Sequence, residues 1–198
     1  MNVSAVVLAA GKSDRFLGAR DKLLAEWKGR TLIEYVFDAV TNARLAGVVT
    51  EGVVVTSPSA TRIKSLAVGE GFRVLHPPPD ASISASLKTA IAGLAPGADG
   101  AVVLLGDQPL VTGNAIGAVI RAARNSPQAL VRAHYRGYAD SVSHPAFLGR
   151  NHFGLVHLAE PGEGFVATVE RHGLRWTEVW FDGDNPDIDF ALDLDRLG

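Results

Sequence analysis

Residues 6–22 read VVLAAGKSDRFLGARDK. An apolar run from Val6 to Ala10 ends at Gly11, and four cationic side chains follow: Lys12, Arg15, Arg20 and Lys22. In an open α/β sheet, ligands bind at the carboxyl ends of the strands. A glycine there lets the backbone approach a ligand closely, and the cations suit a polyphosphate. The stretch predicts a buried strand leading into a phosphate-binding loop, although an ordinary strand-to-helix turn with surface cations would have the same composition.

Valine-rich apolar runs alternate with amphipathic helical stretches along the chain. Such runs are typical of strands in a parallel sheet that is covered on both faces. We expect strands over 3–10, 51–57, 72–76, 100–106, 128–135 and 176–181. We expect helices that begin at Thr31, which forms a capping box with Glu34, and at Ser57, and further helices over 84–94, 112–123, 152–159, 163–173 and 189–198. This order predicts a three-layer α/β/α sandwich with a mainly parallel, Rossmann-like sheet.

Length and composition restrict the class of protein. The chain has 198 residues, 47% of them hydrophobic, which suits one folded domain over residues 1–198. The formal net charge of −2 argues against nucleic acid as a partner. No apolar run reaches the ~20 residues that a membrane-spanning helix needs. The chain contains no cysteine, which excludes thiol chemistry and fits a cytoplasmic location.

Two familiar phosphate-binding signatures do not match the loop after residue 10. The P-loop motif G-x-x-x-x-G-K-[ST] requires a second glycine where this chain has Phe16. The dinucleotide-binding motif G-x-G-x-x-G requires a glycine where it has Ser13. A P-loop NTPase and a Rossmann dehydrogenase are therefore disfavoured.

The same loop resembles the signature of a known enzyme family. LAAGKSDRF…DKLL is similar to L-A-[AG]-G-x-S-x-R-[MF]-G…K of the MobA-like nucleotidyltransferases, which have a glycosyltransferase-A-like fold. The resemblance implies that the loop holds the triphosphate of a nucleotide. It implies nucleotide contacts from Leu8, Ala9, Ala10, Gly11, Lys12, Arg15 and Lys22.

Two further segments that resemble sequences of this family contain acidic side chains. Asp107 comes directly after the apolar run in VVLLGDQPLV (102–111), and Asp187 and Asp189 flank Ile188 in NPDIDFALDLDRL (185–197). Mg²⁺ prefers oxygen ligands and usually takes one or two carboxylates plus substrate phosphates. By resemblance, Asp107 and Asp189 are the metal ligands and Asp107 also contacts the nucleotide. The alternatives are a turn cap for Asp107 and an acidic helix start for Asp187 and Asp189.

Two other segments carry expectations about the nucleotide and its acceptor. SISASLKTAI (82–91) resembles a segment of the molybdopterin cytidylyltransferase branch, which implies nucleotide contacts from Ser82 and Ser86 and an acceptor contact from Lys88. A helix N-terminus with Ser84 as cap is the alternative. In SVSHPAFLGR (141–150), the His-Pro pair implies that His144 lines the acceptor site, and a purely structural histidine is the alternative. In relatives, the loop at 162–165 faces the acceptor, and here the sequence of this loop departs from the family pattern.

Together, these motifs predict an Mg²⁺-dependent nucleotidyltransferase. It would transfer a nucleoside monophosphate from an NTP, with CTP favoured, to a phosphate-bearing acceptor such as molybdopterin, and release pyrophosphate. Arg15, Lys22 and Asp107 are the expected catalytic residues. The alternatives are a guanylyltransferase, a sugar- or polyol-phosphate nucleotidyltransferase, and a non-catalytic nucleotide-binding accessory protein. A molybdoenzyme apo-protein is a candidate partner.

Overall fold

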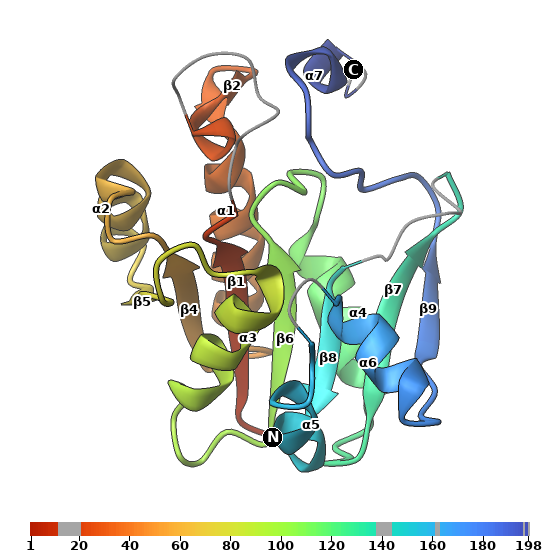
Figure 1. Cartoon of the computed structure of the whole chain (residues 1–198). Coiled ribbons are helices and arrows are strands. Elements are labelled where there is room, and N and C mark those ends of the chain that lie inside the picture. Colours follow the sequence, from red (N-terminus) through yellow and green to blue (C-terminus); the bar gives the residue numbers. More distant parts are fainter. Residues whose placement is uncertain (12–20, 138–143, 161–162, 196, 198) are drawn as a thin grey trace.

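A seven-stranded sheet forms the centre of the protein, seen here in a computed structural model that describes residues 1–11, 21–137, 144–160, 163–195 and 197 (Figure 1). The strand order is β5-β4-β1-β6-β8-β7-β9. Every pair of neighbours is parallel except the two that include β8. The strands are β1 (Val3–Ala9), β4 (Glu51–Thr56), β5 (Arg73–Leu75), β6 (Gly100–Leu105), β7 (Leu130–Tyr135), β8 (Ala146–Gly149) and β9 (Thr177–Phe181).

Helices cover both faces of this sheet. One face packs against α1 (Leu32–Leu45), α2 (Thr61–Gly69) and α4 (Gly113–Ala122) through a core that includes Phe37, Ile63 and Ile116. The other packs against α3 (Ile83–Ala92), α5 (Phe153–Val156) and α6 (Phe165–Arg171) through a second core that includes Leu87, Val156 and Val169. The predicted three-layer α/β/α sandwich with a mainly parallel sheet is confirmed.

The expected strands and most expected helices are present. Glu34 accepts hydrogen bonds from the backbone N–H and the hydroxyl of Thr31, at 2.8 and 2.6 Å, so the predicted capping box at the start of α1 is confirmed. The predicted start of a helix at Ser57 is wrong. The Ser57 hydroxyl instead bonds the hydroxyl and the backbone N–H of Ser59, which makes a turn, and α2 begins only at Thr61.

Strand β8 was not anticipated from the sequence. It has four residues, all buried, and pairs antiparallel with both β6 and β7. So short an apolar run cannot be assigned to a strand by its periodicity. Its place between two longer strands supplies the hydrogen bonds that define it.

Several small elements lie beyond the carboxyl ends of the strands (Figure 1). The 3-10 helix η1 (Lys22–Leu24) is followed by a hairpin of β2 (Glu26–Trp27) and β3 (Arg30–Thr31), whose turn has positive φ at Lys28 and Gly29. The last helix, α7 (Ala191–Asp195), stands at the same end of the molecule. At the opposite end of the sheet, next to the start of β6, another 3-10 helix, η2 (Arg150–His152), follows β8 and precedes α5. Among the residues described here, none of the helices has the length and apolar character needed to cross a bilayer.

Candidate active site

Three neighbouring cavities follow the carboxyl edge of the sheet. The first, about 430 Å³, lies beyond β4 and β5, the second, about 120 Å³, beyond β1 and β6, and the third, about 780 Å³, over β6, β8 and β7. Ala10, Gly11 and Ala81 line both the first and the second. Leu8, Ile83 and Leu105 line both the second and the third. The shared residues place the three cavities next to one another in a row, with the second in the middle, and we call this row the cavity track.

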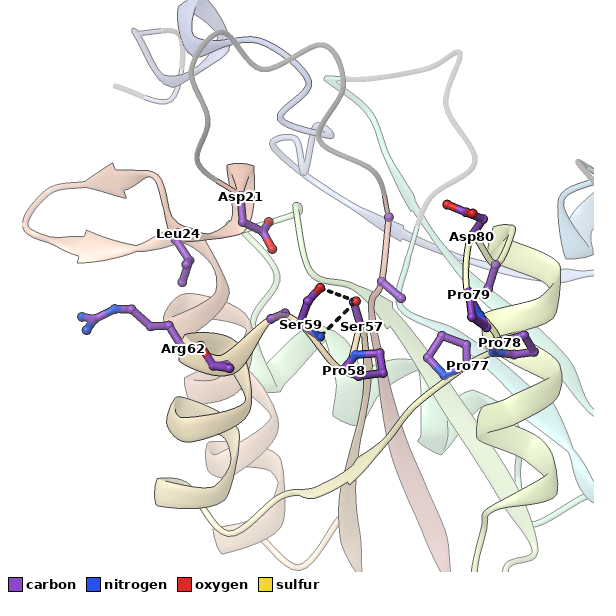
Figure 2. Close-up of a pocket in the computed structure, with 15 residues that line it drawn as sticks. Asp21, Leu24, Ser57, Pro58, Ser59, Arg62, Pro77, Pro78, Pro79 and Asp80 are labelled. Carbon is purple, nitrogen blue, oxygen red and sulfur yellow. Dashed lines mark hydrogen bonds between the residues drawn. The ribbon is translucent and has the colours of Figure 1, made fainter.

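The first cavity lies between the turn after β4 and the proline-rich segment after β5. Figure 2 shows Ser57 and Ser59 between Asp21 and Leu24 on one side and residues 77–80 on the other. Two side chains, the buried Thr56 and the exposed His76, hold the strand ends beneath it. The hydroxyl of Thr56 donates to Ala9 O at 3.1 Å, and His76 Nδ1 lies 2.8 Å from Thr56 O. The ends of β1, β4 and β5 are thereby fixed relative to one another.

A charged centre stands at the middle cavity. Lys22 Nζ lies 2.6 Å from Asp107 Oδ2 and 3.0 Å from Asp189 Oδ1. Asp107 follows β6 by two residues, and Lys22 is the first residue of η1, which Asp21 caps by accepting from Leu23 N at 3.1 Å. Asp189 comes from the segment after β9. One ammonium group thus bridges two carboxylates that are far apart in the sequence.

The protonation of this centre follows from its burial and its charges. Burial by itself lowers the pKa of Lys22, but the charges and hydrogen bonds of Asp107 and Asp189 outweigh it, so the pKa lies above its usual value. Burial first, and the charge of Asp107 second, raise the pKa of Asp187 to about 6, although the hydrogen bond from Gln108 opposes them. The ammonium of Lys22 is therefore favoured by the negative charges of Asp107 and Asp189 beside it.

A buried amide pair braces the acidic segment. Gln108 Nε2 donates to Asp187 Oδ1 at 2.7 Å, and Asn185 Nδ2 donates to Gln108 Oε1 at 3.3 Å and to His144 O at 3.2 Å. The backbone N–H of Ile188, a fully buried residue, donates to Asp107 O at 3.0 Å. Neither Gln108 nor Asn185 was predicted from the sequence to have a role in the site. Their proximity to Asp107 and Asp187 in the chain was the available signal.

The donor set suits a divalent cation. Two carboxylates converge on a single cationic atom, and carboxylate oxygen is the ligand type that Mg²⁺ and Mn²⁺ prefer. Within the described part of the chain, no group of three or more His, Asp or Glu side chains is arranged as a complete metal site. Asp107 and Asp189 therefore fit a metal that completes its coordination with substrate phosphates.

Most of the expected nucleotide-binding residues meet at the middle cavity. It is lined by Leu8, Ala9, Ala10, Gly11, Lys22, Ser86 and Asp107. Ser82 instead caps α3 by accepting from Ala85 N at 3.3 Å, so Ser84 is not the cap. Lys12 and Arg15 lie outside the described residues.

Of the two expected acceptor-binding residues, only His144 is among the residues that line the third cavity. His144, which precedes Pro145 with a cis peptide bond, lines the third cavity. Lys88 Nζ donates to Ala159 O at 2.8 Å, a bond that ties α3 to the segment after α5. His144 remains a predicted acceptor contact on the cavity wall. The observed bond of Lys88 is structural, and its acceptor contact remains a prediction.

Residues 163–165, the described part of the loop at 162–165, lead into α6. Glu163 accepts hydrogen bonds from Glu160 N at 3.0 Å, from the Thr168 hydroxyl at 3.0 Å, and from Arg171 Nη2 at 2.9 Å. The bond from Arg171 is the main reason why the pKa of Glu163 falls to about 2. Glu163 therefore stabilises the helix that covers the third cavity.

Comparison with known proteins assigns this architecture to a family. The family model of the MobA-like NTP transferase domain matches residues 5–174. Bifunctional protein GlmU of Lactococcus lactis subsp. cremoris is 29% identical over 130 residues, which cover 60% of this chain and 25% of the relative. The match therefore spans about a quarter of the length of that curated relative.

Solved structures agree over the whole length. Rv0371c from Mycobacterium tuberculosis superimposes with a TM-score of 0.82 at 26% identity and covers 100% of this chain and 98% of its own, and its complex with manganese gives 0.80 at 25% identity with the same coverage. A nucleotidyl transferase from Methanothermobacter gives 0.81 at 24% identity, covering 99% and 95%, and shares the fold. With the family match over residues 5–174, these findings show that the chain belongs to the MobA-like NTP transferases, a family of nucleotidyltransferases.

Proposed function

We propose that this protein transfers a nucleoside monophosphate from an NTP to a phosphate-bearing acceptor, in the presence of Mg²⁺, and releases pyrophosphate. The observation that carries the proposal is the convergence of Lys22, Asp107 and Asp189 at the middle of the cavity track. We infer that base and ribose occupy the first cavity, the triphosphate the second and the acceptor the third. Arg15 and Lys12, which follow β1 in the sequence, would add to the charge of Lys22.

The chemistry requires no protein nucleophile. An oxygen of the acceptor phosphate attacks the α-phosphorus, a new P–O bond forms, and the bond from the α-phosphorus to the bridging oxygen breaks. The acceptor phosphate is already ionised at neutral pH, so the protein contributes position and charge. Lys22 and Arg15 would neutralise the departing pyrophosphate. A divalent cation held by Asp107 and Asp189 would supply further charge neutralisation on phosphate oxygens.

CTP and molybdopterin are the proposed substrates, on the strength of the sequence motifs. The segment 82–91 supports the cytidylyltransferase branch, and Ser86 of that segment lines the middle cavity. The complex of the mycobacterial relative with manganese supports a divalent metal. We place the reaction in the cytoplasm, where nucleoside triphosphates are available, and regard a molybdoenzyme apo-protein as a candidate recipient of the product.

The test is a pyrophosphate-release assay with each of CTP, GTP, ATP and UTP, Mg²⁺ and molybdopterin. We expect release with CTP and a loss of roughly a hundredfold or more in Asp107→Asn, by comparison with removal of one group that stabilises transition-state charge. Asp38→Asn is the matched control, because Asp38 pairs with Arg30 at the surface, away from the cavities. Release with GTP alone would identify a guanylyltransferase. Tight nucleotide binding without release, for any acceptor tried, would contradict the enzymatic proposal.

A further inference from the structure

A fourth cavity, of about 480 Å³, lies along the segment that leads from β9 to α7 (Figure 1). All of its described lining residues fall within 184–193, and we call this lining the C-terminal groove. Asp187 of the groove also lines the third cavity, and Asp189 pairs with Lys22 at the charged centre. A molecule bound in the groove would therefore lie beside the candidate active site.

Large apolar side chains are exposed at the groove. Phe190 is 50% exposed and Leu192 is 71% exposed, and both line the groove together with Pro186. A single exposed apolar side chain is ordinary in a folded protein, whereas neighbouring ones that surround a hollow mark a contact surface. The groove therefore offers apolar area that a partner can remove from water.

Hydrogen bonds keep the groove in shape. Asp193 Oδ2 accepts from Asp189 N at 3.0 Å and from Phe190 N at 2.8 Å. The backbone N–H of the fully buried Ile188 donates to Asp107 O at 3.0 Å, which ties the same segment to the end of β6. A surface that is already ordered loses little conformational entropy when a partner binds to it.

The groove is acidic. Four of its lining residues are aspartates, and residues 181–195 contain six aspartates and no Lys, Arg or His. Lys22 balances part of the charge of Asp189, whereas the side chain of Asp184 is exposed to solvent. This charge favours a cationic partner and disfavours nucleic acid or an anionic membrane surface.

The same charge disfavours a second copy of this chain as the occupant. In a two-fold symmetric dimer, each subunit presents the same surface to the other. Two copies joined through the groove would set its aspartates against each other. A metal ion alone is disfavoured for another reason, because it would bind the carboxylates and leave Phe190 and Leu192 exposed.

A peptide segment with both basic and apolar side chains satisfies the groove. Its apolar side chains can cover Phe190 and Leu192, and its ammonium or guanidinium groups can pair with the carboxylates. The aliphatic stems of Lys and Arg also pack on apolar surface while their charged ends reach the carboxylates. Charge and burial therefore favour the same kind of partner.

We propose that the C-terminal groove is a docking site for a basic, amphipathic segment of a partner protein. The contact uses Phe190 and Leu192 as its apolar part and Asp184 as a charged part. The inference goes beyond the proposed reaction and does not depend on which nucleotide or acceptor the site uses. It places the partner next to the third cavity, because Asp187 lines both.

The test compares three fluorescein-labelled synthetic peptides by fluorescence anisotropy. The first is a basic amphipathic peptide of Lys and Leu, the second has Ala for every Leu, and the third has Glu for every Lys. We expect the Lys–Leu peptide to bind at least roughly tenfold more tightly than either of the others, a difference of ~1.4 kcal/mol. Absence of binding by the Lys–Leu peptide, or equal affinity for the Lys–Ala peptide, would overturn the proposal.

Variants assign the binding to the groove. Leu192→Ser and Asp184→Lys should each weaken binding of the Lys–Leu peptide at least roughly tenfold. Leu45→Ser and Glu70→Lys are the matched controls, because both residues are exposed and lie outside the groove, and they should leave the affinity within about twofold. Unchanged affinity in Leu192→Ser and Asp184→Lys would contradict the proposal.

Two further measurements separate this proposal from its alternatives. Leu192→Ser should bind CTP·Mn²⁺ within about twofold of the wild type, which shows that the active site is intact. Sedimentation should give the same mass for the wild type and for Leu192→Ser. A wild-type dimer that dissociates in Leu192→Ser would identify a second copy as the occupant and overturn the proposal. Failure of pyrophosphate release with peptide binding intact would overturn only the proposed function.

Discussion

Lys22 Nζ and Asp107 Oδ2 lie 2.6 Å apart, and the same ammonium lies 3.0 Å from Asp189 Oδ1. A side-chain cation thus stands between the two carboxylates that are proposed to hold a divalent metal. Lys22 neutralises the repulsion between Asp107 and Asp189 that burial would otherwise strengthen. Nucleotide phosphates offer Lys22 a second set of anionic partners, so nucleotide and metal are expected to bind cooperatively.

Replacing Lys22 by Met should strengthen metal binding in the absence of nucleotide. The substitution removes the competing cation and leaves two carboxylates without it, so we expect Mn²⁺ affinity to rise roughly tenfold. Turnover should fall, because the cation for the pyrophosphate is lost as well. Titration with Mn²⁺ followed by electron paramagnetic resonance measures the affinity. Lys64→Met, at an exposed position of α2, is the control, and equal affinity in the two variants would contradict this role of Lys22.

Two glycines at the site should respond differently to alanine. Among the described residues, no heavy atom lies within 4 Å of a Cβ built on Gly11, apart from its chain neighbours, so Gly11→Ala should leave stability unchanged. If a nucleotide approaches the backbone there, the methyl group should weaken CTP binding roughly tenfold.

Gly106 is the matched position. A Cβ there would lie 3.0 Å from Ile33 Cδ1 and 3.2 Å from Leu8 O, so Gly106→Ala should lower the free energy of unfolding by about 1–3 kcal/mol. Urea unfolding and isothermal titration with CTP separate the two effects. A Gly11→Ala protein with wild-type CTP affinity would remove the support for close nucleotide approach.

Gln108→Leu should impair the metal site without touching a proposed ligand. Gln108 is 2% exposed and links Asp187 to Asn185, so the variant leaves both polar groups short of a partner. We expect a loss of about 1–3 kcal/mol in stability and weaker Mn²⁺ binding, because the acidic segment is no longer held. Thermal unfolding and the Mn²⁺ titration measure these. Gln128→Leu, an exposed change before β7, is the control, and a fully stable Gln108→Leu protein would refute the bracing role.

Acid should weaken the fold through Glu163. Its pKa is lowered to about 2, chiefly by the hydrogen bond from Arg171, whereas a free glutamate has a pKa of about 4.3. The ionised carboxylate therefore stabilises the folded state above pH ~4.3, and this contribution is lost as the pH falls toward 2. Melting temperatures of the wild type and Glu163→Gln should differ at neutral pH and converge between pH ~4 and ~2. A constant difference across this range would argue against the ion pair, and Glu70→Gln, at the end of α2, serves as the control.

Local patterns accounted for much of the fold. The valine-rich runs of β1, β4 and β6 and the capping box of α1 were recognisable because hydrophobic burial and backbone capping depend on residues close in the chain. The start of α2 and the existence of β8 were not recognisable from the sequence. Ser57 had an alternative hydrogen bond within its own turn, and β8 depends on partners that are distant in sequence.

By itself, the sequence determined which side chains end the strands: Gly11 after β1 and Asp107 after β6, with acidic residues near the C-terminus. Tertiary structure alone decided that Lys22 lies between Asp107 and Asp189, that Gln108 meets Asp187, and that Arg132 pairs with Glu178. The physical reason is the distance along the chain over which each effect acts. Periodicity and turn chemistry act over a few residues, whereas these contacts depend on strand order and register, which only the packing of the whole chain fixes.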